Sequence, residues 1–494
     1  MEYLILEHPR LPSRDRFNDI ANTPLWSCLM GGYAASALEQ AGFTTALLDH
    51  AQPGLTFDQT LEAVLALNPG LVSVNAVYFW EESQALVDFF TQLKAQGWQG
   101  HLNLFGFFPT LVFDRILAGC PAVDSICVGE FEHTLPALAR ALDGSQGDIH
   151  AIPGLATAEN LDRNTFTRRP PEKNPDIFAP PRRGSLEGRV TLLGSRGCYN
   201  HCSFCPVPSF YNQGSLWRGR SPENILREVK ALHRQGVRKF YFSDANFIGP
   251  GRSGKKRTLA LMELLRPLNI DFGMETRPQD LDAEVLEAMV SAGFSSLLMG
   301  IESGSKAVLE KISKGTVTDT GARAIALCRE FGIEPEIGFL MFVPDASPED
   351  LAANMAFLKE NRLLDRLERT ANLLSHQHIV LAGTSGYDQF QAQGRLQPKG
   401  IFGFEGHVPF THPTTDQVRE IVVHAAHTVL RSMGEPDSPI HWAKTESLVH
   451  QAVNDYLVTL FDRTLENAKT ADLLGEIAAL KEKINTEIQA ILGS

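Results

Sequence analysis

Three cysteines stand close together near the middle of the chain, within the stretch Arg196-Gly197-Cys198-Tyr199-Asn200-His201-Cys202-Ser203-Phe204-Cys205. Their C-x3-C-x2-C spacing places three thiolates on one short loop, and the apolar run Val190–Leu193 before it predicts that the loop leaves the end of a strand. A [4Fe–4S] cluster is held at its iron corners by about four thiolate-type ligands. Three cysteines can therefore hold three corners and leave the fourth iron open to a small chelating molecule.

Two other roles for these cysteines are less consistent with the sequence. A disulfide framework is typical of small secreted domains, whereas this chain has 494 residues and only 7 cysteines. A zinc site needs a fourth nearby ligand, and His201 lies within the loop, so zinc remains the alternative.

The loop resembles the signature of radical S-adenosylmethionine (SAM) enzymes, in which an aromatic residue, here Phe204, precedes the third cysteine. The resemblance implies that Cys198, Cys202 and Cys205 bind a [4Fe–4S] cluster and that Phe204 contacts SAM. In that family SAM binds the fourth iron through its amino and carboxylate groups, and reduction of the cluster cleaves SAM to a 5′-deoxyadenosyl radical. An electron donor such as flavodoxin or ferredoxin is expected as a partner.

The chain carries a formal net charge of −13 and has a sequence pI near 5.6. This acidic balance argues against nucleic acid as the main partner, because binding phosphates needs a basic face. The first residues do not form a signal peptide, and no apolar run approaches the roughly 20 residues that span a membrane. We therefore expect a cytoplasmic protein, in a reducing compartment that suits an iron–sulfur cluster.

Strand and helix patterns alternate through residues 1–147 with short connections. Apolar runs such as Tyr3–Leu6 and Leu71–Tyr78 predict parallel strands that are buried on both faces, and helical patterns such as Phe57–Leu67 separate them. These features predict a Rossmann-like, flavodoxin-like α/β sheet. In such sheets ligands bind beyond the carboxyl ends of the strands.

This region resembles the cobalamin-binding domain that is often joined to radical SAM cores. The resemblance is carried by a helix and two turns, namely Leu29 to Gly42, Gly106-Phe107-Phe108-Pro109-Thr110 and Val128-Gly129-Glu130-Phe131-Glu132. It implies that cobalamin contacts Ser73, Asn75, Gly106, Gly129 and Glu130.

The chain also departs from the cobalamin-binding pattern. Phe107 and Phe108 replace a glycine and a histidine of the family, and no D-x-H-x-x-G motif supplies a ligand to cobalt. Cobalt would then lack a protein ligand or take another side chain, with His8 and His50 as candidates. The alternative is a flavodoxin-like domain that binds nothing or only docks the substrate.

Residues 148–187 are rich in proline and charge and predict a domain linker. Residues 188–399 hold about six strand–helix units, with the sixth strand near Leu373 to Leu381. Radical SAM enzymes resemble a partial, six-stranded version of the (β/α)8 barrel, whose site lies at the carboxyl ends of the strands. The resemblance implies that SAM contacts the strand-end residues Asp244, Glu275, Arg277, Glu302, Ser303 and Gly338. The structural alternative is that Glu275 and Arg277 pair with each other inside the barrel.

Residues 400–494 predict amphipathic helices at Thr415–Met433, Lys444–Asn467 and Ala471–Leu492. We expect this region to cap the barrel, or else to bind a partner protein. No cysteine follows Cys328, so auxiliary iron–sulfur clusters are not expected.

Together the patterns predict a cobalamin-dependent radical SAM methyltransferase that acts on an unactivated carbon of a small molecule, lipid or peptide. A cyclase or rearrangement enzyme with the same two cofactors is the second hypothesis. A cobalamin carrier without catalysis is the third. Nothing in the sequence selects the substrate.

Overall fold

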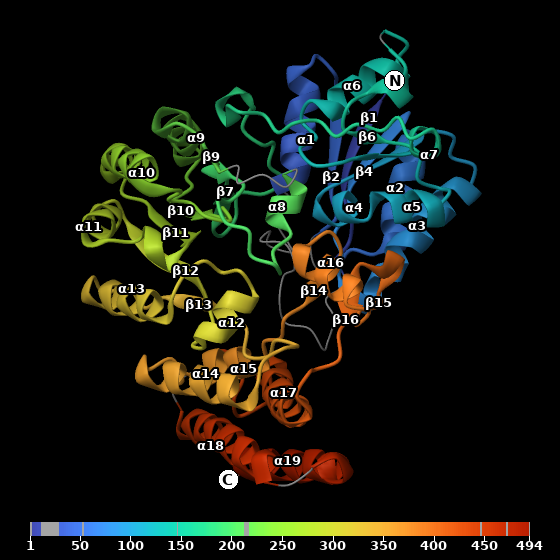
Figure 1. Cartoon of the computed structure of the whole chain (residues 1–494). Coiled ribbons are helices and arrows are strands. Elements are labelled where there is room, and N and C mark those ends of the chain that lie inside the picture. The colour runs from blue at the N-terminus through green and yellow to red at the C-terminus, as the bar shows by residue number, and fades with distance from the viewer. Residues whose placement is uncertain are drawn as a thin grey trace.

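The computed structural model describes residues 2–10, 29–51, 54–145, 147–211, 217–444, 447–470 and 473–493 of the chain. Figure 1 shows two α/β units side by side and a set of helices at the C-terminal end. No helix within the described ranges is both long and apolar enough to cross a membrane.

The first unit, called the sheet domain below, is built around a six-stranded sheet of order β2-β1-β3-β4-β5-β6. All neighbours pair in parallel except β5 and β6, and the order of the first five strands is that of flavodoxin. The predicted flavodoxin-like sheet is thereby confirmed. The strands are β1 (Tyr3–Glu7), β2 (Thr45–Asp49), β3 (Leu71–Asn75), β4 (His101–Phe105), β5 (Ser125–Cys127) and β6 (Leu155–Ala156).

Helices cover both faces of this sheet (Figure 1). One face packs its apolar side chains against α1 and α6, and the other against α2, α3 and α5. Alternate residues of each strand therefore face different helix layers, which explains why apolar residues occur on both faces of the strands. The helices are α1 (Leu29–Gln40), α2 (Phe57–Leu67), α3 (Gln84–Ala95), α4 (Phe107–Leu111), α5 (Phe113–Gly119), α6 (Thr134–Leu142) and α7 (Ala158–Asp162).

The second unit, called the half-barrel, has a five-stranded parallel sheet of order β13-β12-β11-β10-β7. Its strands are β7 (Val190–Leu192), β10 (Lys239–Phe242), β11 (Asp271–Thr276), β12 (Phe294–Glu302) and β13 (Glu336–Phe339). The helices between and after them are α9 (Pro222–Arg234), α10 (Gly251–Leu265), α11 (Ala283–Ser291), α12 (Lys306–Lys311), α13 (Thr318–Glu330) and α14 (Pro348–Glu360). Within the described ranges the sheet stays open, as a partial barrel requires.

The sixth strand is shorter than predicted. Residues 373–375 belong to α15 (Leu367–Ser375), and the sixth position is reduced to one parallel bridge between Phe342 and Gln377. Leu367, Ala371 and Leu374 are buried at helical spacing, so the apolar run that suggested a strand continues a helix face instead.

The cysteine loop lies between two short elements, β8 (Ser195–Arg196) and α8 (Val207–Phe210). β8 pairs in an antiparallel hairpin with β9 (Arg218–Gly219), so the loop and α8 are carried on this hairpin. The hairpin stands between the half-barrel and the sheet domain (Figure 1).

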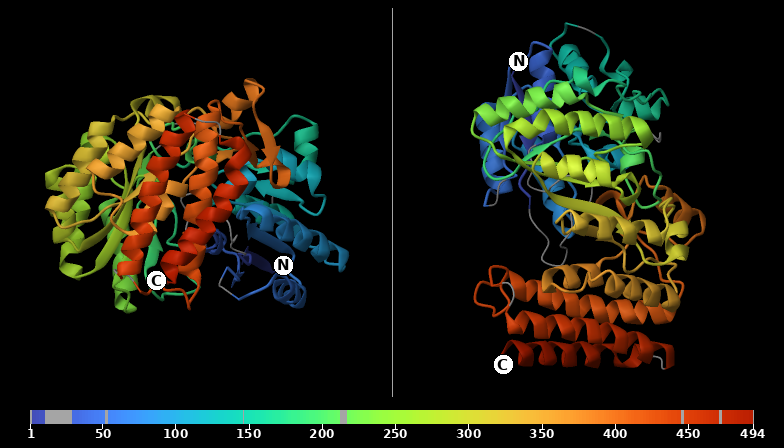
Figure 2. Two further views of the ribbon diagram at one scale, coloured as in Figure 1. Left: turned by 90° about the horizontal axis from the view of Figure 1, so that it is seen from below. Right: turned by 90° about the vertical axis from the view of Figure 1, so that its left-hand side faces the viewer.

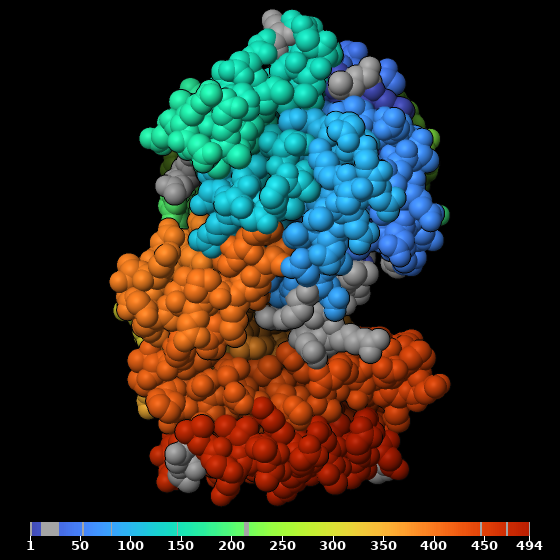
Figure 3. All heavy atoms as spheres, turned by 90° about the vertical axis from the view of Figure 1, so that its right-hand side faces the viewer, coloured from blue at the N-terminus to red at the C-terminus, as the bar shows by residue number. Residues whose placement is uncertain are grey.

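Residues 380–407 return from the half-barrel to the sheet domain, as Figure 3 shows in orange. They form the sheet β14-β16-β15 and helix α16, with β14 (Val380–Leu381), α16 (Ser385–Ala392), β15 (Gln397–Lys399) and β16 (Glu405–His407). Tyr387 and Phe404 belong to the apolar core of the sheet domain, and Arg115 Nη1 of α5 donates to the Tyr387 hydroxyl at 3.1 Å. β15 and β16 pair with each other across the predicted domain limit at residue 400. The proposed domain limits stay predictions.

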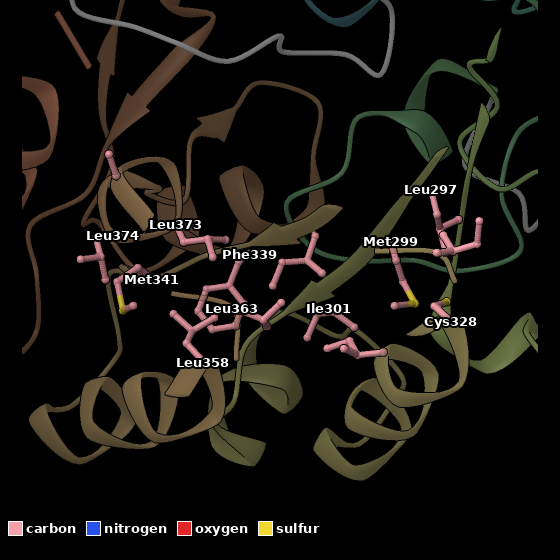
Figure 4. Packing of buried hydrophobic residues seen from close by; sticks show 14 of the residues in the cluster. Leu297, Met299, Ile301, Cys328, Phe339, Met341, Leu358, Leu363, Leu373 and Leu374 are labelled. Atoms are coloured by element: carbon pink, nitrogen blue, oxygen red, sulfur yellow. The ribbon is translucent and has the colours of Figure 1, made fainter. Parts of the chain in front are cut away.

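The predicted C-terminal helices are present as α17 (Pro413–Gly434), α18 (Leu448–Thr470) and α19 (Ile477–Leu492). They stack in layers below α14 and α15, as the right-hand view of Figure 2 shows. One continuous apolar core runs from the half-barrel into this stack. Figure 4 shows part of it, where Leu297, Met299 and Ile301 of β12 lie beside Cys328 of α13. The helices are therefore part of the same folded body as the half-barrel.

Candidate active site

Cys198, Cys202 and Cys205 are half-buried, free cysteines on the loop between β8 and α8. Gly197 before them has a φ of 76°, a left-handed conformation that glycine adopts without steric cost. Burial raises the pKa of the Cys205 thiol, and the charges of Cys202 and Cys198 raise it further. Cys198 and Cys205 both pack against the buried cluster of Val207, Phe210 and Tyr211.

The donor set suits an iron–sulfur cluster. A zinc site would need a fourth ligand beside the three cysteines, and His201 is the candidate within the loop. His201 is exposed, whereas the cysteines are half-buried. A [4Fe–4S] cluster binds each cysteine through a different iron, which three thiolates on one loop can provide.

Hydrogen bonds hold the loop against the half-barrel and against α16. Asn200 Nδ2 donates to Cys202 Sγ at 2.9 Å and to the Lys314 carbonyl at 2.8 Å. The N–H of Gly386, in α16, donates to the Ser203 carbonyl at 2.8 Å. The loop is therefore supported by segments that lie more than a hundred residues away in the sequence.

A buried ion pair lies near Cys202. Lys314 Nζ is 2.8 Å from Glu302 Oε1, and the two residues are only 5% and 8% exposed. Burial acts to lower the pKa of Lys314, but the charges of Glu302 and Cys202 raise it overall, so the ammonium stays charged. A Cβ at Gly300 would lie 2.7 Å from Glu302 Oε1, and a Cβ at Gly338 would lie 3.6 Å from Glu302 Oε2. Glycine at these positions leaves room for the carboxylate.

Arg277 is buried beside the loop, with its guanidinium 5.1 Å from the centroid of the Tyr199 ring. Its Nη2 donates to the Lys314 carbonyl at 2.6 Å. Tyr199 in turn donates to the two carboxylate oxygens of Asp280 at 2.7 and 2.9 Å. Nη1 of Arg277 is buried and has no hydrogen-bond partner within the described part of the chain. A buried cationic donor of this kind suits a carboxylate group of a ligand.

Two predicted SAM contacts already have close partners within the protein. Asp244 accepts hydrogen bonds from Gly194 N at 2.9 Å and from Ser195 Oγ at 2.5 Å, and burial raises its pKa to about 6. Ser303 Oγ donates to Asn354 Oδ1 at 2.6 Å. Both side chains therefore hold neighbouring backbone or helices in place, and their roles as SAM contacts stay predictions.

Two further predicted SAM contacts are Glu275 of the half-barrel and Phe204 of the loop itself. Glu275, at the end of β11, accepts a hydrogen bond from the Tyr241 hydroxyl at 3.3 Å. The Phe204 ring meets His378 edge-on, with ring centroids 6.2 Å apart. Among the described residues, both buried ring nitrogens of His378 lack a hydrogen-bond partner, and burial lowers its pKa to about 4, so this imidazole is neutral near pH 7.

On the sheet domain, two predicted cobalamin contacts are strand residues that bond to their neighbours. Ser73 Oγ donates to Asn103 Oδ1 at 2.9 Å. Asn75 Nδ2 donates to both carboxylate oxygens of Glu7, at 3.0 and 2.9 Å. All four residues are buried in the sheet. The hydrogen bonds between Asn75 and Glu7 lie at the carboxyl ends of β3 and β1, which is the edge at which such sheets bind ligands.

The two predicted glycines lie in turns at the same edge. Gly106 and Gly129 have φ values of 111° and 82°, so both require a residue without a Cβ. A Cβ at Gly106 would lie 2.6 Å from Asn75 Oδ1, and one at Gly129 would lie 3.0 Å from the Phe210 carbonyl in α8. Next to Gly106, the Phe107 ring stacks on Phe210 with centroids 4.1 Å apart. This edge of the sheet domain therefore touches the segment that follows the cysteine loop.

His8 is not free to bind a metal in this structure. Its Nε2 accepts a hydrogen bond from Val77 N at 3.0 Å, and its Nδ1 lies 2.7 Å from the Pro9 carbonyl. His50 Nδ1 lies 2.8 Å from Thr60 Oγ1.

A small cavity of about 30 Å³ lies between the sheet domain and the cysteine loop. Leu29, Met30 and Phe107 line it from the sheet domain, and Gly197 lines it from the loop, next to the first cysteine. Glu130 lies at the same interface, with its two carboxylate oxygens 3.1 Å from Arg196 Nη1 and 2.8 Å from Arg218 Nη1. The site therefore has walls from both α/β units.

Asn200 and Lys314 are candidate functional residues that the sequence patterns did not single out. A single lysine after a helix is usually a solvated surface charge. Asparagine in a short loop usually bonds to its own backbone. Only the C-x3-C-x2-C context could have drawn attention to Asn200, since it lies between the first two cysteines.

Comparison with known proteins defines the class of the chain. Residues 192–358 match the model of the Radical SAM superfamily. This part of the chain is similar to the radical SAM domain, and it follows the flavodoxin-like sheet domain in the sequence.

Two curated relatives are similar over most of this architecture. An uncharacterized methyltransferase of Pyrococcus horikoshii is 26% identical over 329 residues, which cover 64% of this chain and 69% of the relative. The anaerobic magnesium-protoporphyrin IX monomethyl ester cyclase of Synechocystis sp. is 28% identical over 348 residues, or 67% of each chain.

Two solved structures share the fold. The cobalamin-dependent radical enzyme OxsB, with aqua-cobalamin and SAM bound, has a TM-score of 0.74 at 18% identity and is matched over 94% of this chain and 71% of its own. The radical SAM methyltransferase TsrM of Kitasatospora setae, with tryptophan and a SAM analogue bound, has a TM-score of 0.65 at 16% identity over 99% of both chains. The order of a sheet domain, a half-barrel and C-terminal helices is therefore an established fold.

Proposed function

We propose that this protein is a cobalamin-dependent radical SAM enzyme that transfers a methyl group to an unactivated carbon. The observation that carries the proposal is the contact between Phe107 and Phe210, which brings the carboxyl edge of the sheet domain to the cysteine loop. Ligands of doubly wound sheets bind beyond that edge. The fold shared with OxsB and TsrM supports the same reading, because the structures of OxsB and TsrM are described with bound cobalamin.

The residues at the edge are compatible with a flat, largely apolar cofactor. Gly106 and Gly129 keep side chains away from the turns, and Phe107 with Met30 offers apolar surface. The cavity between the two units holds about one water molecule.

When bound, SAM and the [4Fe–4S] cluster supply a radical that abstracts hydrogen, and cobalamin supplies the methyl group. The protein positions and shields these groups. Cys198, Cys202 and Cys205 act as the thiolate ligands. We assign the free Nη1 of Arg277 to the SAM carboxylate, since it is a buried cationic donor without a partner within the described ranges. The charge of Lys314 offsets the negative charge that three thiolates bring into a partly buried site.

A cyclase or rearrangement enzyme with the same cofactors is the second candidate. The 28% identity to the Synechocystis cyclase favours it. The two reactions differ in the fate of the SAM methyl group, which reaches cobalamin and product only in a methyltransferase.

The test uses the full chain, reconstituted without oxygen with iron, sulfide and hydroxocobalamin, then reduced and given SAM with a labelled methyl group. We expect cobalamin to remain bound after gel filtration, labelled methylcobalamin to form, and 5′-deoxyadenosine to accumulate. Cys202→Ala is the control, and it should keep cobalamin but form no 5′-deoxyadenosine. Failure to retain cobalamin contradicts the proposal, and 5′-deoxyadenosine without labelled methylcobalamin supports the cyclase class instead.

The same proposal extends to the partners. We expect a small-molecule, lipid or peptide substrate, a reduced flavodoxin or ferredoxin as electron donor, and a cytoplasmic location where the cluster stays reduced. The acidic net charge of −13 gives no support for a nucleic-acid partner. Activity with candidate substrates, measured as methyl label in the product, tests the substrate class directly.

A further inference from the structure

A buried network of four charged side chains joins the sheet domain to the hairpin that carries the cysteine loop. Glu130 and Glu132 belong to the turn after β5, whereas Arg196 lies in β8 and Arg218 in β9. Arg196 is 3.1 Å from Glu130 and 2.5 Å from Glu132, and Arg218 is 2.8 Å from Glu130. All four side chains are at most 7% exposed. The two units are therefore linked by charges that water does not screen.

Aromatic rings fix the geometry of this network. The Arg196 guanidinium lies 4.4 Å from the centroid of Phe178 and 5.0 Å from that of Tyr33. The Arg218 guanidinium lies 5.0 Å from the centroid of Tyr211. Cation–π contacts are strongest where the cation is desolvated, as both arginines are here. Each arginine therefore contacts aromatic rings as well as carboxylates.

The linker takes part as well. Glu172 N donates to Glu130 Oε2 at 2.8 Å, and Arg218 Nη1 donates to the Glu172 carbonyl at 2.5 Å. Glu130 thus connects three segments that are distant in sequence: the turn after β5, the linker and the hairpin. Both of its carboxylate oxygens already accept hydrogen bonds or ion pairs from protein groups.

We propose that Glu130, Arg196 and Arg218 are positioning residues that fix the cysteine loop relative to the carboxyl edge of the sheet domain. Arg196 is two residues before Cys198, and Glu130 follows Gly129 in a turn of that edge. The network is therefore a short, stiff connection between the two sites. The inference rests on the proposed function in one respect: those sites are taken to hold the cluster and cobalamin, so the network sets the distance between the two cofactors.

The physical reason is the cost of a buried charge without its partner. Removing one member leaves the others desolvated and uncompensated, which is more costly than removing the whole set. The orphaned charge regains water most easily if the two units separate. Loss of Glu130 should therefore loosen the interface and broaden the range of distances across it.

The chain offers a closely matched control in Glu228 of α9. Like Glu130, Glu228 is a buried carboxylate that bridges two arginines, with Arg183 and Arg220 each 2.7 Å away. Its side chain is 4% exposed. Its ion pairs within the described residues connect Arg183 of the linker to Arg220 just before α9. Glu228→Gln therefore removes a similar pair of ion pairs and leaves the ion pairs of Glu130 in place.

The experiment compares the wild-type chain with Glu130→Gln, Glu130→Gln/Arg218→Gln and Glu228→Gln. Pulsed electron paramagnetic resonance on the reduced, cobalamin-loaded proteins measures the distance distribution between the cluster and cob(II)alamin. Hydrogen–deuterium exchange of residues 128–132 and 195–197 is measured on the same chains without cobalamin. Glu130→Asp is the second variant if Glu130→Gln does not fold.

We expect Glu130→Gln to broaden the distance distribution and to speed exchange of both segments about tenfold or more, because the interface opens locally. The double variant should recover part of the loss, since it leaves fewer uncompensated charges. Glu228→Gln should match the wild type in both measurements at these segments. If Glu130→Asp replaces Glu130→Gln, its effects should be smaller but of the same sign.

Three results would overturn the proposal. The first is a Glu130 variant with wild-type distances and exchange. The second is an equal effect of Glu228→Gln, which would reflect only the general loss of a buried charge. The third is weaker cobalamin binding without any change in distance or exchange, which would make Glu130 a cobalamin contact. A wild-type chain that binds no cobalamin contradicts the proposed function, while the exchange data still decide whether the network positions the loop.

Discussion

Replacement of Lys314 by methionine isolates the energetic role of the ion pair beside the cysteine loop. Lys314 and Glu302 are 5% and 8% exposed, and Nζ and Oε1 are 2.8 Å apart. Methionine keeps most of the unbranched, flexible stem, so the main loss is the charge. Removing one partner of a buried ion pair costs about 3–5 kcal/mol, because the other charge stays desolvated. We expect Lys314→Met to lower the free energy of unfolding by about this amount.

The assay is a urea titration of the cluster-free chain followed by far-ultraviolet circular dichroism. The free energy of unfolding of each variant is taken from the transition of the half-barrel. The double variant Lys314→Met/Glu302→Gln should recover at least about 2 kcal/mol of the loss, since no charge is left without its partner. Lys306→Met is the control. It removes an exposed pair in which Lys306 Nζ is 3.8 Å from Glu310 Oε1, and it should cost less than about 0.5 kcal/mol.

Two outcomes would refute this reasoning. If Lys314→Met unfolds at the same urea concentration as Lys306→Met, the buried pair contributes no more than a surface pair. If the double variant is as unstable as the sum of its single changes, the two side chains are not coupled.

Three further predictions concern the same site. Cys202→Ala should lose the absorption and the paramagnetic signal of a reconstituted four-iron cluster, and a cluster of wild-type intensity would exclude Cys202 as a ligand. Asn200→Leu removes the hydrogen bond to Cys202 Sγ and should lower the cluster potential in a redox titration. A hydrogen bond that is about 1 kcal/mol stronger in the reduced state corresponds to about 40 mV, so an unchanged potential would show that the bond is absent in the loaded protein. Burial raises the pKa of Asp244 from 3.8 to about 6, so the folded state binds this proton more tightly than the unfolded state. Protonation of Asp244 therefore stabilises the fold, and this stabilisation is complete below about pH 4 and is lost as the pH rises through 6. Asp244→Asn should remove this pH dependence of the free energy of unfolding, which amounts to up to about 3 kcal/mol. If the urea midpoints of the wild type and Asp244→Asn change with pH in the same way between pH 4 and 6, this prediction is contradicted.

The local patterns of the sequence predicted both sheets and most helices. The apolar strands of the sheet domain alternate with amphipathic helices, and that alternation allows few arrangements other than a parallel sheet with helices on both faces. The range Phe57–Leu67 is helical as predicted. The three cysteines were also readable, because their spacing is local and their chemistry is specific.

The same local reasoning was wrong about the extent of the sixth strand. The apolar residues between positions 373 and 381 suit either a strand or a helix, since short apolar runs do not show their period clearly. Helix α15 takes the first of them because Leu367 and Ala371 continue the pattern on the N-terminal side. Val380 and Leu381, at the end of the run, form β14 and pair with β16 in a different sheet.

The sequence by itself therefore determined the fold class, the domain order and the loop on which the cluster is expected. The tertiary structure decided which groups surround that loop. Asn200 meets the Lys314 carbonyl 114 residues further on, and Glu130 meets Arg196 and Arg218 at separations of 66 and 88 residues. Periodicity reports only which face of an element is buried. It cannot tell which distant side chain will share the buried space, because that depends on how the sheet domain and the half-barrel pack against each other.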